Sequence, residues 1–276
     1  MSDSWRPGLV ALDIDGTLLK WVEGAGTTYE EIPDATYDAV RRAYHAGCHI
    51  VLASGRSPHG MTRIADLLGL PPEGDERLWV VASNGAVVFR YPDLEVVHEE
   101  TFDARAAVHA VLAEHPNALV AVEERGVGYR VNRPFPDGEL SGELIETEVA
   151  DLVAEHVSRV IIRDPEATVD EFVALGARLG LHGTDYVVGW TAWLDLSPVG
   201  VSKASGLALV AEELGVAQAD VLAIGDGRND IEMLRWAGRG VAMGQAVEEV
   251  HAAADATTET VYDDGVVVEL ERYWPR

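Results

Sequence analysis

The chain is poor in lysine, in cysteine and in long apolar runs, and each shortage narrows the possible classes of protein. No apolar run approaches the roughly 20 residues that a membrane-spanning helix needs, and the first run, residues 8–12, is too short for the core of a signal peptide. Cys48 is the single cysteine, so no disulfide can form within the chain and a reducing, cytoplasmic setting is expected. The sequence also lacks the G-x-x-x-x-G-K-[ST] and G-x-G-x-x-G patterns, which argues against nucleotide-loop and dinucleotide-binding proteins.

Positive charge is scarce. The formal net charge is −26, spread along the chain, and such a surface repels nucleic acid and anionic membranes. Any phosphorylated ligand must therefore meet a locally positive site. Lys20 and Lys203 are the only two lysines, and Lys203 lies between two aspartate-rich motifs that both need a cation.

The order of the apolar runs predicts an α/β fold with a doubly wound parallel sheet. The 276 residues, of which 47% are hydrophobic, can bury one large core or two modest ones. Continuous apolar strands interleaved with helices are typical of a parallel sheet covered on both faces. We expect strands at 9–12, 49–53, 78–82, 221–224 and 240–243, and helices at 35–46, 58–70, 203–214 and 231–237.

The middle of the chain has a different pattern and predicts an α+β insertion. We expect a hairpin of 87–90 with 95–99, helices at 104–114 and 169–179, strands at 118–123, 128–131 and 159–163, and a strand pair through 185–196. The expected domains are a core of residues 1–85 and 198–276 and an insertion of residues 86–197. Hinges are expected near residues 84–85 and 198–200.

Two aspartates follow the first expected strand. Asp13 and Asp15 lie at its carboxyl end, where open α/β sheets place their ligand sites, and Gly16 permits a tight turn that exposes them. In a continuing strand both carboxylates would share one face and repel each other, which a bound cation would relieve. An Asp-Gly turn is also common without a ligand, so this motif alone leaves both interpretations open.

Ser54 and Gly55 end the second expected strand. A hydroxyl and exposed backbone N–H groups at a strand-to-helix turn can hold phosphate oxygens. The alternative is that Ser54 or Ser57 only caps the helix that follows. The phosphate interpretation gains weight because this turn opens on the same sheet edge as Asp13.

A second acidic cluster, Gly-Asp-Gly-Arg-Asn-Asp over residues 225–230, follows the strand at 221–224. Asp226 and Asp230 are four positions apart, which places both on one helical face if the helix begins there. Capping and the helix dipole account for one of them but not for the whole cluster. Lys203 is the first residue of an expected helix, where the helix dipole disfavours a cation. An anionic partner would explain a lysine at this position. The alternative is a lysine exposed to solvent.

Together these segments resemble the haloacid dehalogenase superfamily, and most closely its Cof-type phosphatases with a large α/β cap of the C2 type. The resemblance rests on six motifs in the family's order: DIDGTL at 13–18, ASGR at 53–56, SNGA at 83–86, SK at 202–203, GDGRND at 225–230 and GVAMG at 240–244. It spans nearly the whole chain, and the conjunction is specific although each motif is weak. Within the insertion, the cap of such enzymes, the match is architectural only.

The resemblance implies a role for each matched residue. Asp13 would be the nucleophile and Asp15 the general acid/base, while Ser54, Gly55, Lys203 and Asn229 would bind the phosphate. A Mg²⁺ ion would be held by the Asp13 carboxylate, the Asp15 backbone carbonyl and Asp226, with Asp230 binding or orienting the metal shell. Elementary chemistry agrees, because an ionised carboxylate can attack phosphorus without first losing a proton and Mg²⁺ prefers oxygen ligands.

The expected activity is Mg²⁺-dependent hydrolysis of a small phosphorylated metabolite, in particular a sugar phosphate, through an aspartyl-phosphate. The alternatives are a phosphotransferase or phosphomutase on the same scaffold and a non-catalytic phosphate-ligand sensor. We expect no nucleic-acid or membrane partner and a monomer or weak homodimer. Trp190 and Trp193 are interpreted as packing within the cap, and a solvated cap face is expected for Glu123, Arg125, Arg130 and Arg133.

Overall fold

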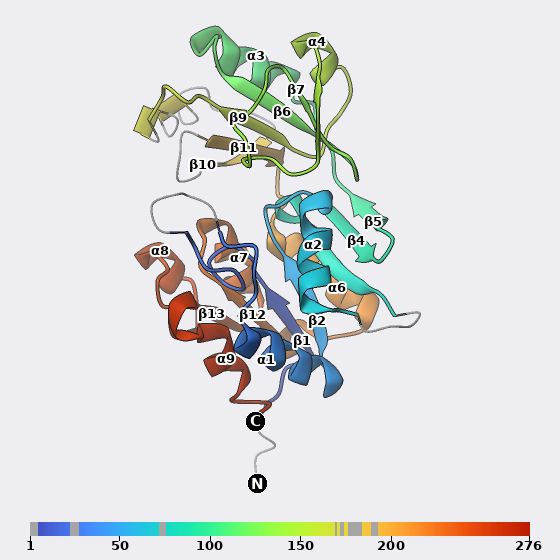
Figure 1. The fold of residues 1–276 in the computed structure, drawn as a ribbon, viewed down its shortest axis with the longest axis vertical. Helices are drawn as coiled ribbons and strands as arrows, with labels where there is room; N and C mark the ends of the chain where they lie inside the picture. The colour runs from blue at the N-terminus through green and yellow to red at the C-terminus, as the bar shows by residue number, and fades with distance from the viewer. Residues whose placement is uncertain are drawn as a thin grey trace.

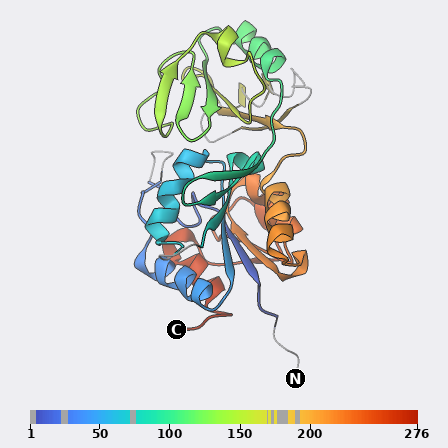
Figure 2. The same ribbon diagram turned by 90° about the vertical axis from the view of Figure 1, so that its right-hand side faces the viewer.

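The structure, a computed structural model, describes residues 5–22, 28–71, 76–168, 170–171, 174–175, 184–188 and 193–276. Over these residues the chain forms an eight-stranded sheet and a separate six-stranded sheet. The larger sheet and its helices form the half of the molecule that carries both termini (Figure 1). The smaller sheet forms the opposite half, and a view turned by 90° shows the same separation (Figure 2).

The larger sheet confirms the expected parallel α/β core. Its strand order is β14-β13-β12-β1-β2-β3-β4-β5, and the neighbours from β14 to β3 pair in parallel. The strands are β1 (Leu9–Leu12), β2 (His49–Ala53), β3 (Leu78–Ala82), β4 (Val87–Tyr91), β5 (Glu95–Glu99), β12 (Val221–Gly225), β13 (Arg239–Ala242) and β14 (Ala256–Thr257). The carboxyl ends of β1, β2 and β12 therefore lie side by side.

Helices cover both faces of this sheet because its central strands are apolar on both sides. Val10 and Leu12 of β1 pack in one buried cluster, and Leu9 and Ala11 pack in another on the opposite face. The first cluster includes residues of α1 (Asp34–His45), α2 (Pro58–Leu68) and α9 (Gly265–Leu270), and the second includes residues of α6 (Lys203–Leu214), α7 (Ile231–Trp236) and α8 (Glu248–His251).

The hairpin of β4 and β5 corrects one expectation. We expected it within the insertion, but β4 pairs antiparallel with β3 and extends the larger sheet. The chain leaves this sheet only after β5. We therefore propose that the insertion begins after Glu99 rather than at residue 86, and that the expected hinge at residues 84–85 is a turn inside the core.

The smaller sheet has the order β10-β11-β9-β6-β7-β8 and a helix-covered face turned away from the core (Figure 1). Val120 and Val122 of its strand β6 share a buried cluster with residues of the helices at 105–114 and 149–152. The elements are α3 (Arg105–Glu114), β6 (Leu119–Glu124), β7 (Gly128–Val131), β8 (Glu143–Glu146), α4 (Val149–Leu152), β9 (Val160–Arg163), β10 (Thr184–Val188) and β11 (Trp193–Pro198). We call this half the cap.

Several short elements were not anticipated: β8, α4, α8, β14 and α9. The helix expected at 169–179 falls largely outside the described residues, as do Trp190 and the side chain of Trp193. Among the helices of the described part, none combines the length and apolar character that crossing a membrane requires.

Candidate active site

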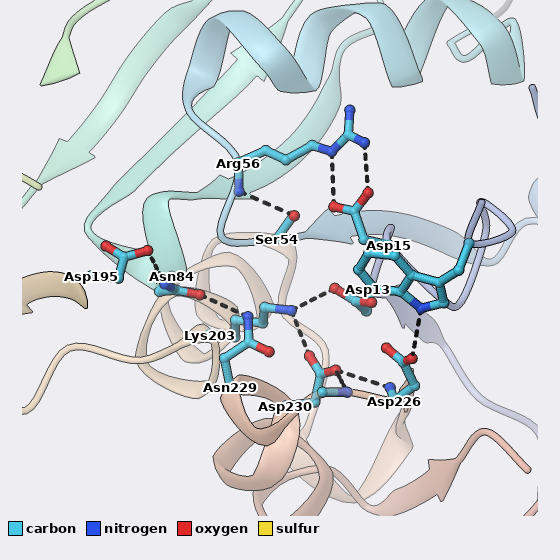
Figure 3. A network of polar contacts seen from close by, with 12 residues as sticks. Asp13, Asp15, Ser54, Arg56, Asn84, Asp195, Lys203, Asp226, Asn229 and Asp230 are labelled. Atoms are coloured by element: carbon cyan, nitrogen blue, oxygen red, sulfur yellow. Dashed lines mark hydrogen bonds and ion pairs between the residues drawn. The ribbon is translucent and has the colours of Figure 1, made fainter. Parts of the chain in front are cut away.

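Lys203 joins the two aspartate motifs. Its Nζ lies 2.6 Å from Asp13 Oδ1 and 2.5 Å from Asp230 Oδ1, and the side chain is 0% exposed. Asp13 follows β1, Asp230 follows β12, and Lys203 is the first residue of α6, so three distant segments meet at one edge of the core sheet (Figure 3). The exposed-lysine alternative is therefore wrong.

A capping box fixes the start of α6, where Lys203 lies. Ser202 caps the helix by accepting a hydrogen bond from the Ser205 backbone N–H, and the Ser205 hydroxyl accepts one from the Ser202 backbone N–H. Burial acts to lower the pKa of Lys203, but the Asp13 and Asp230 carboxylates outweigh it and raise this pKa. The ammonium thus stays charged, although it lies at the helix end that disfavours a cation.

Asp230 orders the loop after β12 as well as pairing with Lys203. Its Oδ2 accepts hydrogen bonds from the backbone N–H groups of Asp226, at 3.0 Å, and Gly227, at 2.8 Å. The helix α7 begins only at Ile231, so Asp226 lies in the loop and the two aspartates do not share a helical face. Asp230 therefore both caps the turn before α7 and pairs with Lys203, so capping accounts for only part of its contacts.

Asp13, Asp226 and Asp230 form a group that could hold a metal ion, because one carboxylate oxygen of each lies within 4.8 Å of the others. Burial and the neighbouring Asp230 raise the pKa of Asp13 well above its usual value. Burial and the same neighbour raise the pKa of Asp226 to about 7. A divalent cation that prefers oxygen ligands would relieve the repulsion among these carboxylates. The set of ligand atoms therefore fits Mg²⁺.

Trp21 and Gln245 hold Asp226 and were not anticipated from the sequence. Asp226 Oδ2 accepts from Trp21 Nε1 at 3.4 Å and from Gln245 Nε2 at 3.1 Å, and the same Gln245 nitrogen donates to the Gly16 carbonyl at 2.6 Å. A Cβ atom on Gly16 would lie 2.1 Å from Asp226 Oδ2, so only glycine permits this approach. Gln245 directly follows the GVAMG motif, which could have indicated it.

Asp15 lies beside this acidic group but its carboxylate faces Arg56 (Figure 3). Arg56 donates through Nε to Asp15 Oδ2 at 2.9 Å and through Nη2 to Asp15 Oδ1 at 2.6 Å. Thr28 donates a third hydrogen bond to Oδ1 at 2.9 Å, and Glu30 accepts from Arg56 Nη1 at 3.0 Å. The Asp15 side chain is thus fixed by an ion pair and is not one of the three grouped carboxylates.

Ser54 and Gly55 lie at the end of β2, facing the same edge. The helix-capping role belongs to Ser57, whose Oγ accepts from the Gly60 N–H at 3.3 Å, while Ser54 Oγ accepts only a 3.2 Å hydrogen bond from the Arg56 N–H among the described contacts. The capping alternative is therefore wrong for Ser54. Within the described part of the chain, no residue accepts its hydroxyl hydrogen, which a phosphate oxygen could accept.

Asn84 connects this edge to Asn229, which donates from Nδ2 to Asn84 Oδ1 at 2.9 Å. Ser83 and Asn84 have φ values of 51° and 55°, unusual for residues with side chains and frequent at functional sites. Gly85 follows at φ 103°, where a Cβ would lie 2.0 Å from the Ser202 carbonyl oxygen. The turn thus packs directly against the start of α6.

Glu123 corrects the expectation of a solvated cap face. It is 8% exposed, and its Oε2 accepts a 2.6 Å hydrogen bond from Ser83 Oγ of the core. Arg125 and Arg133 are exposed as expected, and Arg130 is partly exposed. The sequence could not separate these residues, because burial at the boundary of two domains depends on how they meet.

Comparison with known proteins identifies the class that this fold and site define. The sequence model of the haloacid dehalogenase-like hydrolase family matches residues 10–270, and the chain belongs to that family. The resemblance to Cof-type phosphatases is thereby confirmed.

Two curated relatives extend over nearly the whole chain. Phosphoglycolate phosphatase of Natronomonas pharaonis is 32% identical over 263 residues, covering 95% of this chain and 96% of that protein. The 5-amino-6-(5-phospho-D-ribitylamino)uracil phosphatase YitU of Bacillus subtilis is 27% identical over 290 residues, covering 98% of each chain. Such relatives establish a phosphoric monoester hydrolase.

Solved structures agree on the fold. The phosphatase BT1666 of Bacteroides thetaiotaomicron superposes with a TM-score of 0.77 at 26% identity, covering 99% of this chain and 97% of that one. The subclass IIB sugar phosphatase BT4131 gives 0.76 at 23% identity, covering 96% of this chain and 98% of that one, and shows the fold alone.

Proposed function

We propose that this phosphatase hydrolyses a small phosphorylated metabolite, in particular a sugar phosphate, in a Mg²⁺-dependent reaction through an aspartyl-phosphate. The observation that carries the proposal is the buried Lys203 ammonium held between Asp13 and Asp230 at the shared end of β1, β12 and α6. A fixed cation among carboxylates gives a phosphate dianion a place to bind on a protein of strongly negative net charge.

Asp13 is the proposed nucleophile. One of its carboxylate oxygens attacks phosphorus, and the bond between phosphorus and the ester oxygen breaks. Burial favours the protonated form of Asp13, which could not attack, so the neighbouring Lys203 ammonium has to help keep it ionised. Water then cleaves the aspartyl-phosphate and releases inorganic phosphate.

Asp15 is the proposed general acid and base. It gives a proton to the departing ester oxygen and later takes one from the attacking water. Both of its oxygens are now held by Arg56, so Asp15 has to leave this pair and turn toward the ester before it can act. Arg56 would then keep Glu30 as its acidic partner.

The phosphate-binding roles of Ser54, Gly55, Lys203 and Asn229 remain proposals. Lys203 supplies the positive charge, and the Ser54 hydroxyl and Gly55 backbone can supply hydrogen bonds at the end of β2. Asn229 presents an amide that now donates to Asn84. These groups come from the end of β2, the start of α6 and the loop after β12.

The proposed metal ligands are Asp13, Asp226 and the Asp15 backbone carbonyl, with Asp230 binding the ion or orienting its shell. When bound, Mg²⁺ neutralises the carboxylates and polarises the phosphoryl oxygen. The structure supports the set through the proximity of three carboxylates and through Trp21 and Gln245, which fix the position of Asp226.

The cellular location, the partners and the oligomeric state of the enzyme are also proposals. A cytoplasmic location is supported by the lone cysteine, Cys48, which is buried and not in a disulfide. The net negative charge argues against nucleic acid as a partner. A monomer or weak homodimer remains our expectation.

The test compares the wild type with Asp13→Asn, using p-nitrophenyl phosphate with Mg²⁺ or with a chelator. We expect the chelator and the substitution each to reduce turnover to background, with a circular dichroism spectrum that stays native. Turnover near the wild-type rate in Asp13→Asn would exclude Asp13 as nucleophile. Adding free sugars separates hydrolysis from phosphoryl transfer, because a transferase forms new sugar phosphates instead of inorganic phosphate.

A further inference from the structure

The cap turns a polar patch toward the core. Side chains alternate along β6, so Val120 and Val122 pack beneath the cap helices while Leu119 and Ala121 lie on the opposite face with Tyr129. The same alternation and the pairing of the strands place four polar residues on the face opposite α3 and α4, which looks toward the core (Figure 1). We call them the cap cluster: Glu123, Tyr129, Arg159 and Asp195.

The cap cluster is almost fully buried and its positive charge is already matched. The exposed fractions are 8% for Glu123, 3% for Tyr129, 6% for Arg159 and 9% for Asp195. Arg159 donates to Asp195 from Nε at 2.9 Å and from Nη2 at 2.6 Å, and from Nη1 to the Tyr129 hydroxyl at 3.2 Å. Its Nη1 lies 4.0 Å from Glu123 Oε2.

Hydrogen bonds link the cap cluster to the catalytic edge of the core. Ser83 donates to Glu123 Oε2 at 2.6 Å, and Asn84 Nδ2 donates to Asp195 Oδ2 at 3.5 Å. Asn84 in turn accepts from Asn229, which lies beside Lys203 in Figure 3. The cap cluster is therefore separated from the proposed phosphate site by a single side chain, that of Asn84.

Glu123 has an unused acceptor at this boundary. Its Oε1 is buried and has no hydrogen-bond partner within the described part of the chain. Burial and the nearby Asp195 carboxylate raise the pKa of Glu123 to about 7, while Arg159 and Ser83 act in the opposite direction. A buried oxygen without a partner is unfavourable, and a ligand that supplied a donor would correct this.

We propose that the cap cluster recognises the leaving group of the substrate, that Glu123 accepts a hydrogen bond from one of its hydroxyls, and that the cluster selects uncharged polyhydroxylated leaving groups over anionic ones. This inference rests on the phosphatase function proposed above. Asp195 neutralises Arg159, so ionised Glu123 gives the cluster one net negative charge and protonated Glu123 gives none. A leaving group with its own carboxylate would be repelled or would gain nothing.

The leaving group reaches the cap cluster as the cap and core separate, because all four side chains are less than one-tenth exposed. A substrate hydroxyl then takes the place of the Ser83 hydroxyl on Glu123 or bonds to the unused Oε1. The competing interpretation is that these contacts only fasten the cap to the core. If the contacts only fasten the cap, substitutions in the cap cluster should change kcat/KM equally for every substrate. If the cluster recognises the leaving group, the change should depend on the leaving group.

The experiment measures kcat/KM for three kinds of ester: several neutral sugar phosphates, phosphoglycolate, which carries a carboxylate, and p-nitrophenyl phosphate, which carries no hydroxyls. In Glu123→Gln we expect the best sugar phosphate to lose about ten- to a hundredfold in kcat/KM, as for a hydrogen bond to a charged group. The value for p-nitrophenyl phosphate should change by less than about threefold. Glu124→Gln is the matched control, because Glu124 is the next residue, is 40% exposed and pairs with Arg130 instead.

A second variant tests the charge argument independently. Asp195→Asn keeps the shape of the side chain but leaves Arg159 without its counterion, so the ratio of kcat/KM for phosphoglycolate to that for the sugar phosphate should rise at least about tenfold. If Glu123→Gln lowers kcat/KM equally for all esters, the contacts only fasten the cap and the inference is overturned. The inference is also overturned if the wild type has a higher kcat/KM for phosphoglycolate than for every neutral ester. Failure of the wild type to hydrolyse any ester with Mg²⁺ would instead reject the proposed function itself.

Discussion

Lys203 Nζ lies 2.6 Å from Asp13 Oδ1, although the two residues are 190 positions apart in the sequence. The contact buries the ammonium completely and forms where α6 begins beside the end of β1. The same nitrogen also contacts Asp230, so one cation holds two carboxylates within the core. Stability and the proposed chemistry therefore depend on the same side chain.

Lys203→Met should destabilise the protein in the absence of metal. Removing one partner of a buried ion pair leaves uncompensated charge, which costs about 3–5 kcal/mol. Urea unfolding in the presence of a chelator measures this loss. Lys20→Met, which replaces the only other lysine, is the matched control and should stay within about 0.5 kcal/mol of the wild type. Equal stability of the two variants would contradict the structural role of Lys203.

Mg²⁺ should stabilise the folded protein, because the proposed site exists only where folding brings Asp13, Asp226 and Asp230 together. Linkage predicts a gain of about 2.7 kcal/mol when the free ion exceeds its Kd a hundredfold. Asp226→Asn should lose most of this gain in thermal unfolding with and without Mg²⁺. Asp220→Asn, an exposed position before β12, should keep it. A Mg²⁺-dependent shift that is unchanged in Asp226→Asn would place the ion elsewhere.

Asp15→Asn should slow turnover by about 10²–10⁴-fold, the usual contribution of a general acid or base. The loss should be larger for an alkyl phosphate than for p-nitrophenyl phosphate, because p-nitrophenolate leaves readily without a proton. Initial rates on both esters measure the difference. Identical losses on the two would mean that Asp15 does not protonate the leaving group, and its pairing with Arg56 would then be its main role.

Much of the core and the position of its candidate site could be predicted from the sequence, because apolar strands and their terminal motifs are local signals. Asp13, Ser54 and Asp226 each follow an apolar run, and neighbouring parallel strands bring the carboxyl ends of these runs to one edge. The hairpin of β4 and β5 shows the limit of such signals. Alternation and a turn predict a hairpin, but they do not say which sheet it joins.

Side-chain partners across distant segments were not predictable. Trp21 and Gln245 contact Asp226 only because separate loops meet after folding. The pairing of Asp15 with Arg56 likewise depends on side-chain orientation at two strand ends. The sequence predicts a solvated face for Glu123, because its own strand gives no sign that the core covers it.

Glu123 should make stability fall as pH rises through neutrality. Its pKa in the folded protein is raised from 4.5 to about 7, mainly by burial, so between these values the folded state binds more protons than the unfolded state. The slope of the unfolding free energy with pH is then negative, and the contribution present below pH 4.5 is lost as pH passes 7. The loss is at most on the order of 3 kcal/mol.

Comparing Glu123→Gln with the wild type isolates this effect from the other buried acids, because Asp13, Asp195 and Asp226 are present in both. Glutamine does not titrate, so the difference in unfolding free energy between the two proteins should move in favour of the variant as pH increases from 5 to 8. Chemical denaturation at each pH, with a chelator present, measures it. Glu124→Gln should follow the wild-type profile. If Glu123→Gln also follows that profile, Glu123 is already ionised in the folded protein at acidic pH, and the charge that the cap presents to a leaving group is fixed.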